Sequence, residues 1–476
     1  MKADWWTPRL AGPVIAAAVV RFALLACSLF RGGTNAIIFP DTPSYLEPGR
    51  NLLLHGRFFA DGVPDLLRTP GYSLFFAITS LGGLTVSAAA NVILSVFSVI
   101  LVWRLGRRVF DDHRIALGAA WIFAFEPIAV KFSVVLYSET LFLTCFLLSM
   151  ERIAAFLLER RLRVLAVGGL WLAAATFVRP VSYYLPVALA LGLFLVLARV
   201  PGLRWKAPAV LLITVLPWLA AWQIRNRVET GYDGFSSVGV YNLYFNDAAE
   251  VKALVEHRSA DDVRNEFGFV GANTNGQQRY LYQPYLTSHP EQTGWSQDRR
   301  LNFMHSEAMH IIRAHYWVYL HTCVVALFQT VADSGFGSFE GYMNLRASSK
   351  YSTSLLKGGL LTRVIALSTA HPWKMVEKAA FSILLLGLYL FAARGTYLAA
   401  RGVFRSGMCN SCVWLLLGTS LYFFAVAAAG SRAGGRFRLP VMPVVCILAS
   451  AGFRRGVRTS GFPHTACGPL SGSEQT

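Results

Sequence analysis

The sequence has little charge for its length. Asp, Glu, Lys and Arg together make up 15% of 476 residues, against roughly 25% in soluble domains. A soluble chain this long would form several domains with polar surfaces, so that class is excluded. The seven cysteines are scattered, mostly inside apolar stretches, and predict no disulfide framework. No internal repeat stands out, which counts against a transporter built from two related halves.

What the chain does contain is apolar sequence in long blocks. Hydrophobic residues make up 54% of it, and many blocks approach the roughly 20 residues that cross a bilayer as a helix. The net charge of +18 could indicate nucleic acid. The cations, however, lie in short runs between the apolar blocks, as the positive-inside bias requires. We therefore predict an all-α integral membrane protein with no nucleic-acid partner.

Ten membrane spans are predicted, with a range of ten to twelve. They lie near residues 11–30, 84–103, 115–131, 138–158, 164–178, 181–199, 207–222, 376–394, 412–430 and 439–453. With the N-terminus inside, the arginine runs at 104–108, 160–163, 401–405 and 454–458 all fall on the cytoplasmic side. The first span is read as uncleaved, because no small-residue cleavage site follows it.

One apolar segment, residues 315–333, does not fit this order. If it crossed alone, Arg401 and Arg405 would fall outside the cytoplasm. It either lies along the membrane or pairs with a weak crossing near 355–370. Lys357 and Arg363 make that pairing segment a poor membrane helix, so we favour the first arrangement.

These spans divide the chain into four parts. An N-terminal membrane module covers 1–222 and includes a first extracytoplasmic loop at 31–69. A polar extracytoplasmic loop region follows at 223–313, rich in Asn, Gln, Tyr and Gly. A C-terminal membrane module covers 314–458, and 459–476 form a small polar tail, predicted to be disordered and cytoplasmic.

Several charges lie where topology does not need them, at the outer ends of spans. They are Arg68, Arg179, Arg225, Arg432, Arg436, Arg438, Asp41, Glu126, Lys131 and Glu139. Any one cation there can reach lipid headgroups by extending its side chain. Several at one depth, mixed with acids, favour a shared site, and arginines suit an anion such as phosphate. Arg21 interrupts the first span, where a charge faces either a structural partner or a cavity.

The first loop carries the pattern FPDTPSYLEPGRNLLLHGRF, beginning at Phe39. Pro43 suits the first turn of a helix, which places Asp41 at the helix N-terminus, where the dipole favours an ionised carboxylate. Tyr45 lies four residues further, over the same face. Taken alone, this pattern favours Asp41 as a helix cap. The alternative is a carboxylate placed for chemistry.

Taken together, these motifs resemble the membrane glycosyltransferases of the GT-C superfamily. The bacterial relatives of protein O-mannosyltransferases and aminoarabinose transferases are most similar. The matching motifs follow in order: Asp41 and Tyr45, Gly56-Arg57-Phe58, RTPGYSLFFA from Arg68, YSETLF around Glu139, Arg179-Pro180, PWLAAWQIRNR around Arg225, and RFRLPVMP from Arg436. Each motif is short, but their order covers residues from Arg21 to Phe453.

The resemblance implies transfer of a sugar, with inversion, from a polyprenyl-phosphate carrier to an acceptor hydroxyl outside the cytoplasm. Such a reaction needs a base for the acceptor proton and cations for the leaving phosphate. By resemblance, Asp41 is the candidate base, and Arg68 lies near the carrier phosphate. The same resemblance assigns Tyr45, Glu139, Arg179, Arg225 and Asn242 to substrate binding. It also implies a bacterial cytoplasmic membrane, a site facing the periplasm or exterior, and a role in the cell envelope.

The chain departs from these relatives at two points. Some relatives carry further basic residues where Arg68 stands, which leaves Arg179 or Arg225 as the alternative contact for the phosphate. Many relatives carry an acidic pair where Asp41 is followed by Thr42, which leaves the sugar and acceptor contacts open. No DxD motif or His/Asp cluster requires a metal, so no cofactor is predicted, although a divalent metal is not excluded. Two rival interpretations stay open: a transporter or flippase of lipid-linked sugars, and a non-catalytic envelope polysaccharide protein that binds the same lipid.

Overall fold

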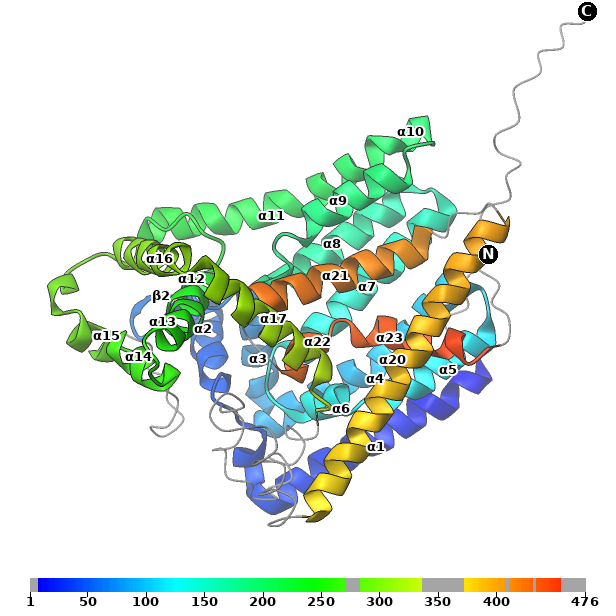
Figure 1. Ribbon diagram of the computed structural model, residues 1–476, viewed down its shortest axis with the longest axis horizontal. Coiled ribbons are helices and arrows are strands. Elements are labelled where there is room, and N and C mark those ends of the chain that lie inside the picture. The colour runs from blue at the N-terminus through cyan, green and yellow to red at the C-terminus, as the bar shows by residue number, and fades with distance from the viewer. Residues whose placement is uncertain (1–6, 270–282, 336–371, 407–410, 431–433, 455–476) are drawn as a thin grey trace, which may run out of the picture.

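The structure is a computed structural model that describes residues 7–269, 283–335, 372–406, 411–430 and 434–454. Long and short helices form one bundle, drawn in Figure 1. The helices of the bundle are α1 (Ala11–Gly32), α4 (Leu84–Phe110), α5 (His113–Ala124), α6 (Pro127–Val134), α7 (Glu139–Glu159), α8 (Leu162–Val178), α9 (Leu185–Val196), α10 (Pro201–Arg204), α11 (Lys206–Thr230), α17 (Tyr316–Ala332), α20 (Pro372–Ser406), α21 (Ser411–Ala429), α22 (Gly435–Arg438) and α23 (Met442–Gly452).

The predicted all-α membrane architecture is confirmed, and each of the ten expected spans coincides with helix. Within the described residues, six helices are long and apolar enough to cross a membrane, and two bent helix pairs raise that number to eight. Three further expected spans are shorter apolar helices, Leu162–Val178, Pro180–Val196 and Met442–Gly452. The total of ten crossings stays a prediction.

The expected span 115–131 is broken rather than continuous. Helices α5 and α6 meet at an angle of 56°, because Pro127 begins α6 and Glu126 caps it, its Oε2 accepting from the N–H of Ala129 at 2.6 Å. A proline at the first helical position is a regular start signal. The sequence therefore already contained the signal, at Pro127, for a second helix to begin within the expected span.

The ambiguous segment 315–333 forms α17, which is bent by 98° from α16 (Gln297–Ala314). Only the two helices together are long and apolar enough to span. Helix α17 packs against α21 and α22, and the hydroxyl of Tyr319 donates to the carbonyl of Ala429 at 2.6 Å. Whether α17 crosses stays open, since the alternative partner near 355–370 lies outside the described residues.

The first loop region folds against the outer end of the bundle. Its elements are η2 (Gly33–Ile37), α2 (Thr42–His55), β1 (Phe59–Ala60), β2 (Val63–Pro64), α3 (Pro70–Thr79) and η3 (Ser80–Gly82). The strands form a small antiparallel hairpin. Asp61 and Gly62 turn it, both at positive φ, as a tight hairpin turn requires.

The second loop region is helical and gathers at one end of the bundle, to the left in Figure 1. Its elements are α12 (Val238–Asn242), the π-helical η5 (Leu243–Ala248), α13 (Ala249–Val255), α14 (Ala260–Glu266), α15 (Gln283–Ser288), η6 (Pro290–Gln292) and α16. Tyr244, Phe245, Leu301 and Met304 belong to a hydrophobic cluster separate from that of the bundle. The predicted domain boundaries stay a prediction, and the tail 459–476 lies outside the described residues.

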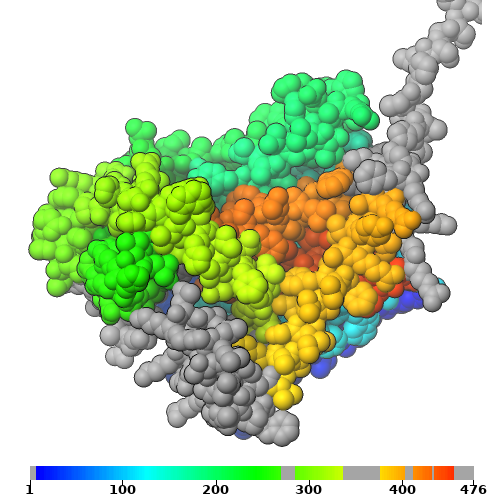
Figure 2. All heavy atoms as spheres, viewed as in Figure 1, coloured from blue at the N-terminus to red at the C-terminus, as the bar shows by residue number. Residues whose placement is uncertain are grey.

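Two glycine contacts show how closely the helices approach. A Cβ on Gly49 of α2 would lie 2.1 Å from the carbonyl oxygen of Ser73 in α3, and one on Gly395 of α20 would lie 1.9 Å from that of Leu448 in α23. Small residues at crossings let helix backbones meet in this way. The first contact fixes α2, which carries the first-loop motif, against α3. On the face shown in Figure 2, α21 is exposed between the α9–α11 side and helices α17 and α20.

Candidate functional site

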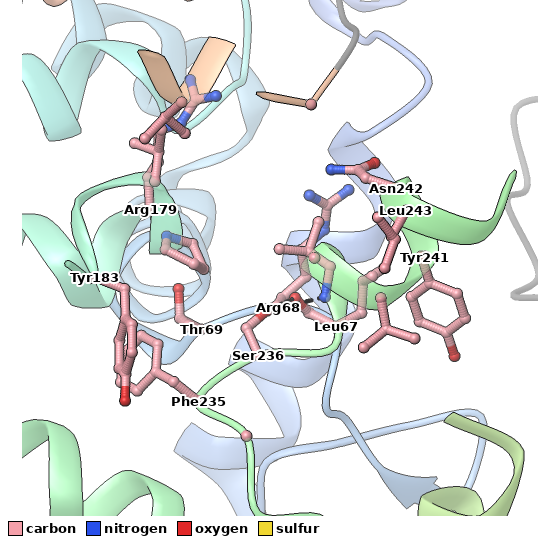
Figure 3. A pocket seen from close by; sticks show the side chains of 18 of the residues that line it. Leu67, Arg68, Thr69, Arg179, Tyr183, Phe235, Ser236, Tyr241, Asn242 and Leu243 are labelled. Carbon is pink, nitrogen blue, oxygen red and sulfur yellow. Dashed lines mark hydrogen bonds between the residues drawn. The ribbon is translucent and has the colours of Figure 1, made fainter. Parts of the chain in front are cut away.

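A cavity of about 1260 Å³ opens between the bundle and the two loop regions. Five of the seven predicted site residues line it, namely Asp41, Tyr45, Arg68, Arg179 and Asn242. Figure 3 shows Arg68 and Asn242, which come from the first loop and from α12, pointing into the same part of the cavity. The convergence of distant segments here is what a shared site requires.

Asp41 occupies the N-cap position of α2, but its side chain makes no capping hydrogen bond. Its Oδ1 pairs with Arg68 at 3.1 Å, and its Oδ2 pairs with Arg436 at 3.1 Å. Both carboxylate oxygens are therefore bound to guanidinium groups. The purely structural interpretation of Asp41 as a helix cap is wrong in this structure.

Thr42 follows Asp41 at the first position of α2. It is buried, its hydroxyl donates to the carbonyl of Leu136 at 3.1 Å, and the N–H of Phe39 donates to it at 3.0 Å. The hydroxyl of Tyr137 also accepts from the backbone N–H of Asp41. Thr42 thus anchors the start of α2 to the segment before α7, which is a structural task, while Asp41 lines the cavity.

Ser44 and Tyr45 also hold Arg68, through three contacts. Its Nε donates to the hydroxyl of Ser44 at 2.8 Å, one terminal nitrogen donates to the hydroxyl of Tyr45 at 3.0 Å, and its guanidinium lies 4.2 Å from the centre of the Tyr45 ring. Tyr45 in turn is within 3.2 Å of Ser138. This frame orients a planar cation with little freedom, which favours bidentate anion recognition.

Glu139 joins the remaining two arginines. Its side chain is 1% exposed, it pairs with Arg179 at 2.7 Å, and it accepts a short hydrogen bond from Nε of Arg436. Arg436 also lies over the Tyr137 ring, 4.7 Å from its centre. Glu139 does not line the cavity itself; it lies behind the arginines and holds them at the wall.

These contacts form one alternating series, Arg68–Asp41–Arg436–Glu139–Arg179, which we call the ion chain. Three guanidinium groups and two carboxylates leave one net positive charge. Each arginine is only partly exposed, between 12% and 27%, so its charge acts in a medium less polar than water. The ion chain is therefore suited to an anion that can share the arginines.

Sequence reasoning left Arg436 out of the site although it lay in a matching motif. It is the central member of the ion chain, because it alone of the three arginines touches both acids. The sequence did not distinguish Arg436 from Arg438, which lies two residues further in the same motif. Arg438 instead donates to the carbonyls of Thr330, Val331 and Asp333 and so caps α17.

Other charged residues at the outer ends of the spans make structural contacts. Glu126 caps α6, and the ammonium of Lys131 lies over the rings of Phe39 and Phe132, at 5.7 and 5.2 Å from their centres. Arg21 is buried and donates to Ser95 and to the carbonyls of Ala17 and Ala124. Of the two alternatives for Arg21, a structural partner or a cavity, the structure therefore shows structural partners. Arg432 lies outside the described residues.

Arg225 does not line the cavity, contrary to expectation. Its guanidinium points behind the first loop and donates to the carbonyls of Phe58 at 2.8 Å and Asp65 at 3.2 Å. It also pairs with Glu229 one turn along α11. Arg225 therefore lies behind the first loop and not at the surface of the cavity.

The cavity wall also carries rings and amides. Tyr183 and Phe235 stack with ring centres 5.3 Å apart and lie together in Figure 3. Asn242 and Asn246 line the cavity from α12 and η5, where π-helical geometry occurs, and such local π-helices are frequent at functional sites. Rings and amides of this kind suit hydroxyl-rich molecules.

No group of three or more His, Cys, Asp or Glu side chains that could hold a metal occurs in the part of the chain that the structure describes. The predicted independence from metal stays a prediction.

The electrostatics of Asp41 give a pH-dependent expectation. Burial alone would raise its pKa, but Arg68 and Arg436 outweigh burial and hold the pKa of Asp41 well below its usual range. Stability from a lowered pKa is present above the unfolded value and lost as pH falls below it. We expect Asp41→Asn to lower the melting temperature by a few degrees, equally at pH 8 and pH 5.

That difference in melting temperature should shrink only below about pH 4. Thermal unfolding of wild type and Asp41→Asn in detergent, followed by intrinsic fluorescence, measures it. A difference that already fades between pH 7 and pH 5.5 would show that Asp41 is not paired as described.

The comparisons with known proteins agree with the predicted resemblance. Residues 72–223 match the family model described as dolichyl-phosphate-mannose-protein mannosyltransferase. This match confirms the resemblance to the GT-C membrane glycosyltransferases. No curated protein sequence gives a significant match to the chain.

Among solved structures, the oligosaccharyltransferase AglB from Archaeoglobus fulgidus, in complex with an inhibitory peptide and a dolichol-phosphate, is 15% identical. The match covers 93% of this chain and 50% of AglB, with a TM-score of 0.47. ArnT from Cupriavidus metallidurans bound to undecaprenyl phosphate is 13% identical, with 93% and 78% covered and a TM-score of 0.37. The chain thus spans about half the length of the archaeal enzyme.

Proposed function

We propose that this chain is an inverting glycosyltransferase that moves a sugar from a polyprenyl-phosphate carrier to an acceptor hydroxyl on the extracytoplasmic side. The ion chain at the cavity wall is the observation that carries the proposal. It places a carboxylate between two arginines, and a third arginine is joined through Glu139. The family match of residues 72–223 supports the reaction class.

The donor phosphate would be bound by Arg68 and Arg436. In the donor it is a diester with one negative charge, and when the bond from the sugar C1 to the phosphate oxygen breaks, that oxygen gains the electron pair. The arginines therefore bind the leaving group more strongly than the donor, which lowers the barrier to transfer. Glu139 keeps Arg179 and Arg436 near each other for this purpose.

Asp41 would receive the acceptor proton. The acceptor oxygen attacks C1 from the side opposite the phosphate, forms the new glycosidic bond and inverts the configuration, while its proton passes to the Asp41 carboxylate. In the resting site both arginines lower the basicity of Asp41. A phosphate that shares those arginines offsets their charge, so donor binding makes Asp41 a better proton acceptor.

The acceptor would enter beside Tyr183, Phe235 and Asn242, which also line the cavity. Its class, whether protein, lipid or glycan, is set by residues of the second loop region. A lipid-linked sugar transporter is the competing function, and it predicts that the lipid-linked sugar leaves the cavity chemically unchanged.

Replacing Arg68 with Ala should weaken carrier binding by about 10- to 100-fold, because hydrogen bonds to charged groups contribute about 1.5–3 kcal/mol each. The measurement is binding of undecaprenyl phosphate to the purified protein in detergent. Arg57→Ala is the matched control, since Arg57 is an exposed arginine of the same loop. Unchanged affinity in Arg68→Ala would reject the phosphate assignment.

A further inference from the structure

Arg68 depends on a loop whose backbone is bound by the second loop region. Four successive carbonyls, from Pro64 to Leu67, each accept a hydrogen bond from it. The donors are Gln297 Nε2 to Pro64 at 3.3 Å, Arg225 to Asp65 at 3.2 Å, the N–H of Ser237 to Leu66 at 2.8 Å, and the hydroxyl of Ser236 to Leu67 at 2.7 Å. A loop bound at every carbonyl has little freedom to move.

Arg225 ties this strand to the other side of the hairpin. The same guanidinium that binds the Asp65 carbonyl donates to the carbonyl of Phe58 at 2.8 Å, and the N–H of Asp65 donates to that carbonyl as well, at 3.0 Å. The guanidinium also lies over the ring of Trp222, 5.0 Å from its centre. Arg225 therefore closes the base of the hairpin from behind.

Asp65 continues the connection to Arg68. Its Oδ1 accepts from the backbone N–H of Leu67 at 2.7 Å and from that of Arg68 at 3.3 Å. This is the turn that Asp and Asn side chains form with the backbone two residues further along. The carboxylate fixes the backbone from which the Arg68 side chain leaves.

We propose that Arg225 and Asp65 form a clasp that positions Arg68 for the carrier phosphate without touching the substrate. Both are positioning residues, and Arg225 reaches this task from α11, the helix that leads into the second loop region. The clasp therefore links the segment that faces the acceptor to the arginine that binds the donor. This inference rests on the proposed function for its binding test, but not for its stability test.

Asp65 has a second interpretation, as a proton acceptor. Burial raises its pKa to about 6, although the N–H groups of Leu67 and Arg68 and the charges of Arg68 and Arg225 oppose the shift. Asp65, however, lines a separate small pocket of about 60 Å³ rather than the main cavity. Its position favours the turn, and the two roles predict different behaviour of the Asn variant.

The binding test compares Arg225→Ala with Arg227→Ala. Arg227 is the matched control on the same helix, because it forms only an exposed pair with Asp233 in which both side chains are 74% exposed. We expect Arg225→Ala to weaken undecaprenyl phosphate binding by about 10-fold, and Arg227→Ala to leave it unchanged. In an Arg68→Ala background, Arg225→Ala should cause no further loss, because its effect passes through Arg68. A full further loss would overturn the clasp.

The stability test does not need a substrate. Arg225 and Asp41 share no contact, so their effects on melting temperature should add unless Arg68 connects them. We expect the decrease caused by Asp41→Asn to be clearly smaller in an Arg225→Ala background than in wild type or in Arg227→Ala. Equal decreases in all three backgrounds would overturn the clasp even if the carrier phosphate binds elsewhere.

Asp65 variants separate positioning from proton transfer. Asn keeps an oxygen that can accept from Leu67 and Arg68, whereas Ala keeps none. We expect Asp65→Asn to bind undecaprenyl phosphate like wild type and Asp65→Ala to behave like Arg225→Ala. Since Asn also removes a buried charge, its melting temperature relative to wild type should be higher at pH 7 than at pH 4. An Asn variant as weak as Ala would overturn the role in positioning.

Discussion

Asp41→Asn should abolish sugar transfer while the protein still folds, inserts and binds the carrier. Asn keeps the size of the side chain but cannot accept the acceptor proton, and general base catalysis contributes about 100- to 10,000-fold. Removing the carboxylate also releases Arg68 and Arg436, which both pair with it. We therefore expect turnover to fall by at least about 100-fold and undecaprenyl phosphate affinity to be unchanged or higher.

The assay is transfer from a panel of radiolabelled undecaprenyl-phosphate hexoses to membrane acceptors, with donor binding measured in parallel. Asp262→Asn is the control, an exposed acid in α14. Near-normal turnover in Asp41→Asn would remove Asp41 from the chemistry. Passage of the intact lipid-linked sugar across the membrane, without transfer by wild type, would favour the transporter.

Arg436→Ala should be the most damaging of the arginine substitutions. Arg436 is the one described arginine in contact with both Asp41 and Glu139, so its loss divides the ion chain into two separate pairs. Leaving a buried carboxylate without a partner costs about 3–5 kcal/mol. Glu139 keeps Arg179, which reduces that cost. We expect lower thermal stability together with a loss of carrier affinity of about 100-fold.

Arg436→Lys tests whether the effect is specific to the guanidinium. A single ammonium can satisfy one acid at a time, so we expect Lys to recover most of the stability and little of the carrier affinity. Arg50→Ala, an exposed arginine of α2, is the control for loss of positive charge near the membrane. Full recovery of binding in Arg436→Lys would show that charge alone is required there.

Hydropathy predicted the bundle well, because an apolar block of membrane length has few other ways to satisfy its backbone. It missed the break at Pro127, whose start signal was present, and the length of α20, which extends beyond the expected 376–394. In the second loop region the sequence indicated only a folded or mobile loop. It missed α16, although the buried residues Leu301, Met304, Ala308 and Ile312 recur there at helical spacing.

Most members of the site could be predicted from the sequence. Which acid pairs with which arginine could not. Asp41, Arg68, Glu139 and Arg179 were assigned to the site by the family resemblance, and they belong to the same ion chain. Arg225 and Arg436 occur in equally plausible motifs, yet only Arg436 faces the cavity. That difference depends on how α11 is rotated and where the chain runs between α21 and α23. A single sequence does not encode either quantity in a readable local pattern.

Under the proposed function, the ion chain also influences which lipid phosphates bind to the arginines of the cavity. A bilayer surrounds the protein with anionic headgroups at concentrations far above that of a rare lipid-linked sugar. Asp41 and Glu139 already pair with the arginines, so under the proposed function a phosphate has to share each guanidinium with an internal carboxylate. Under the proposed function, an ordinary phospholipid would gain only a shared pair of arginines. A glycosylated carrier would also gain contacts between its sugar and the rings and amides of the cavity, so the acids that hold the arginines would favour it over more abundant phospholipids.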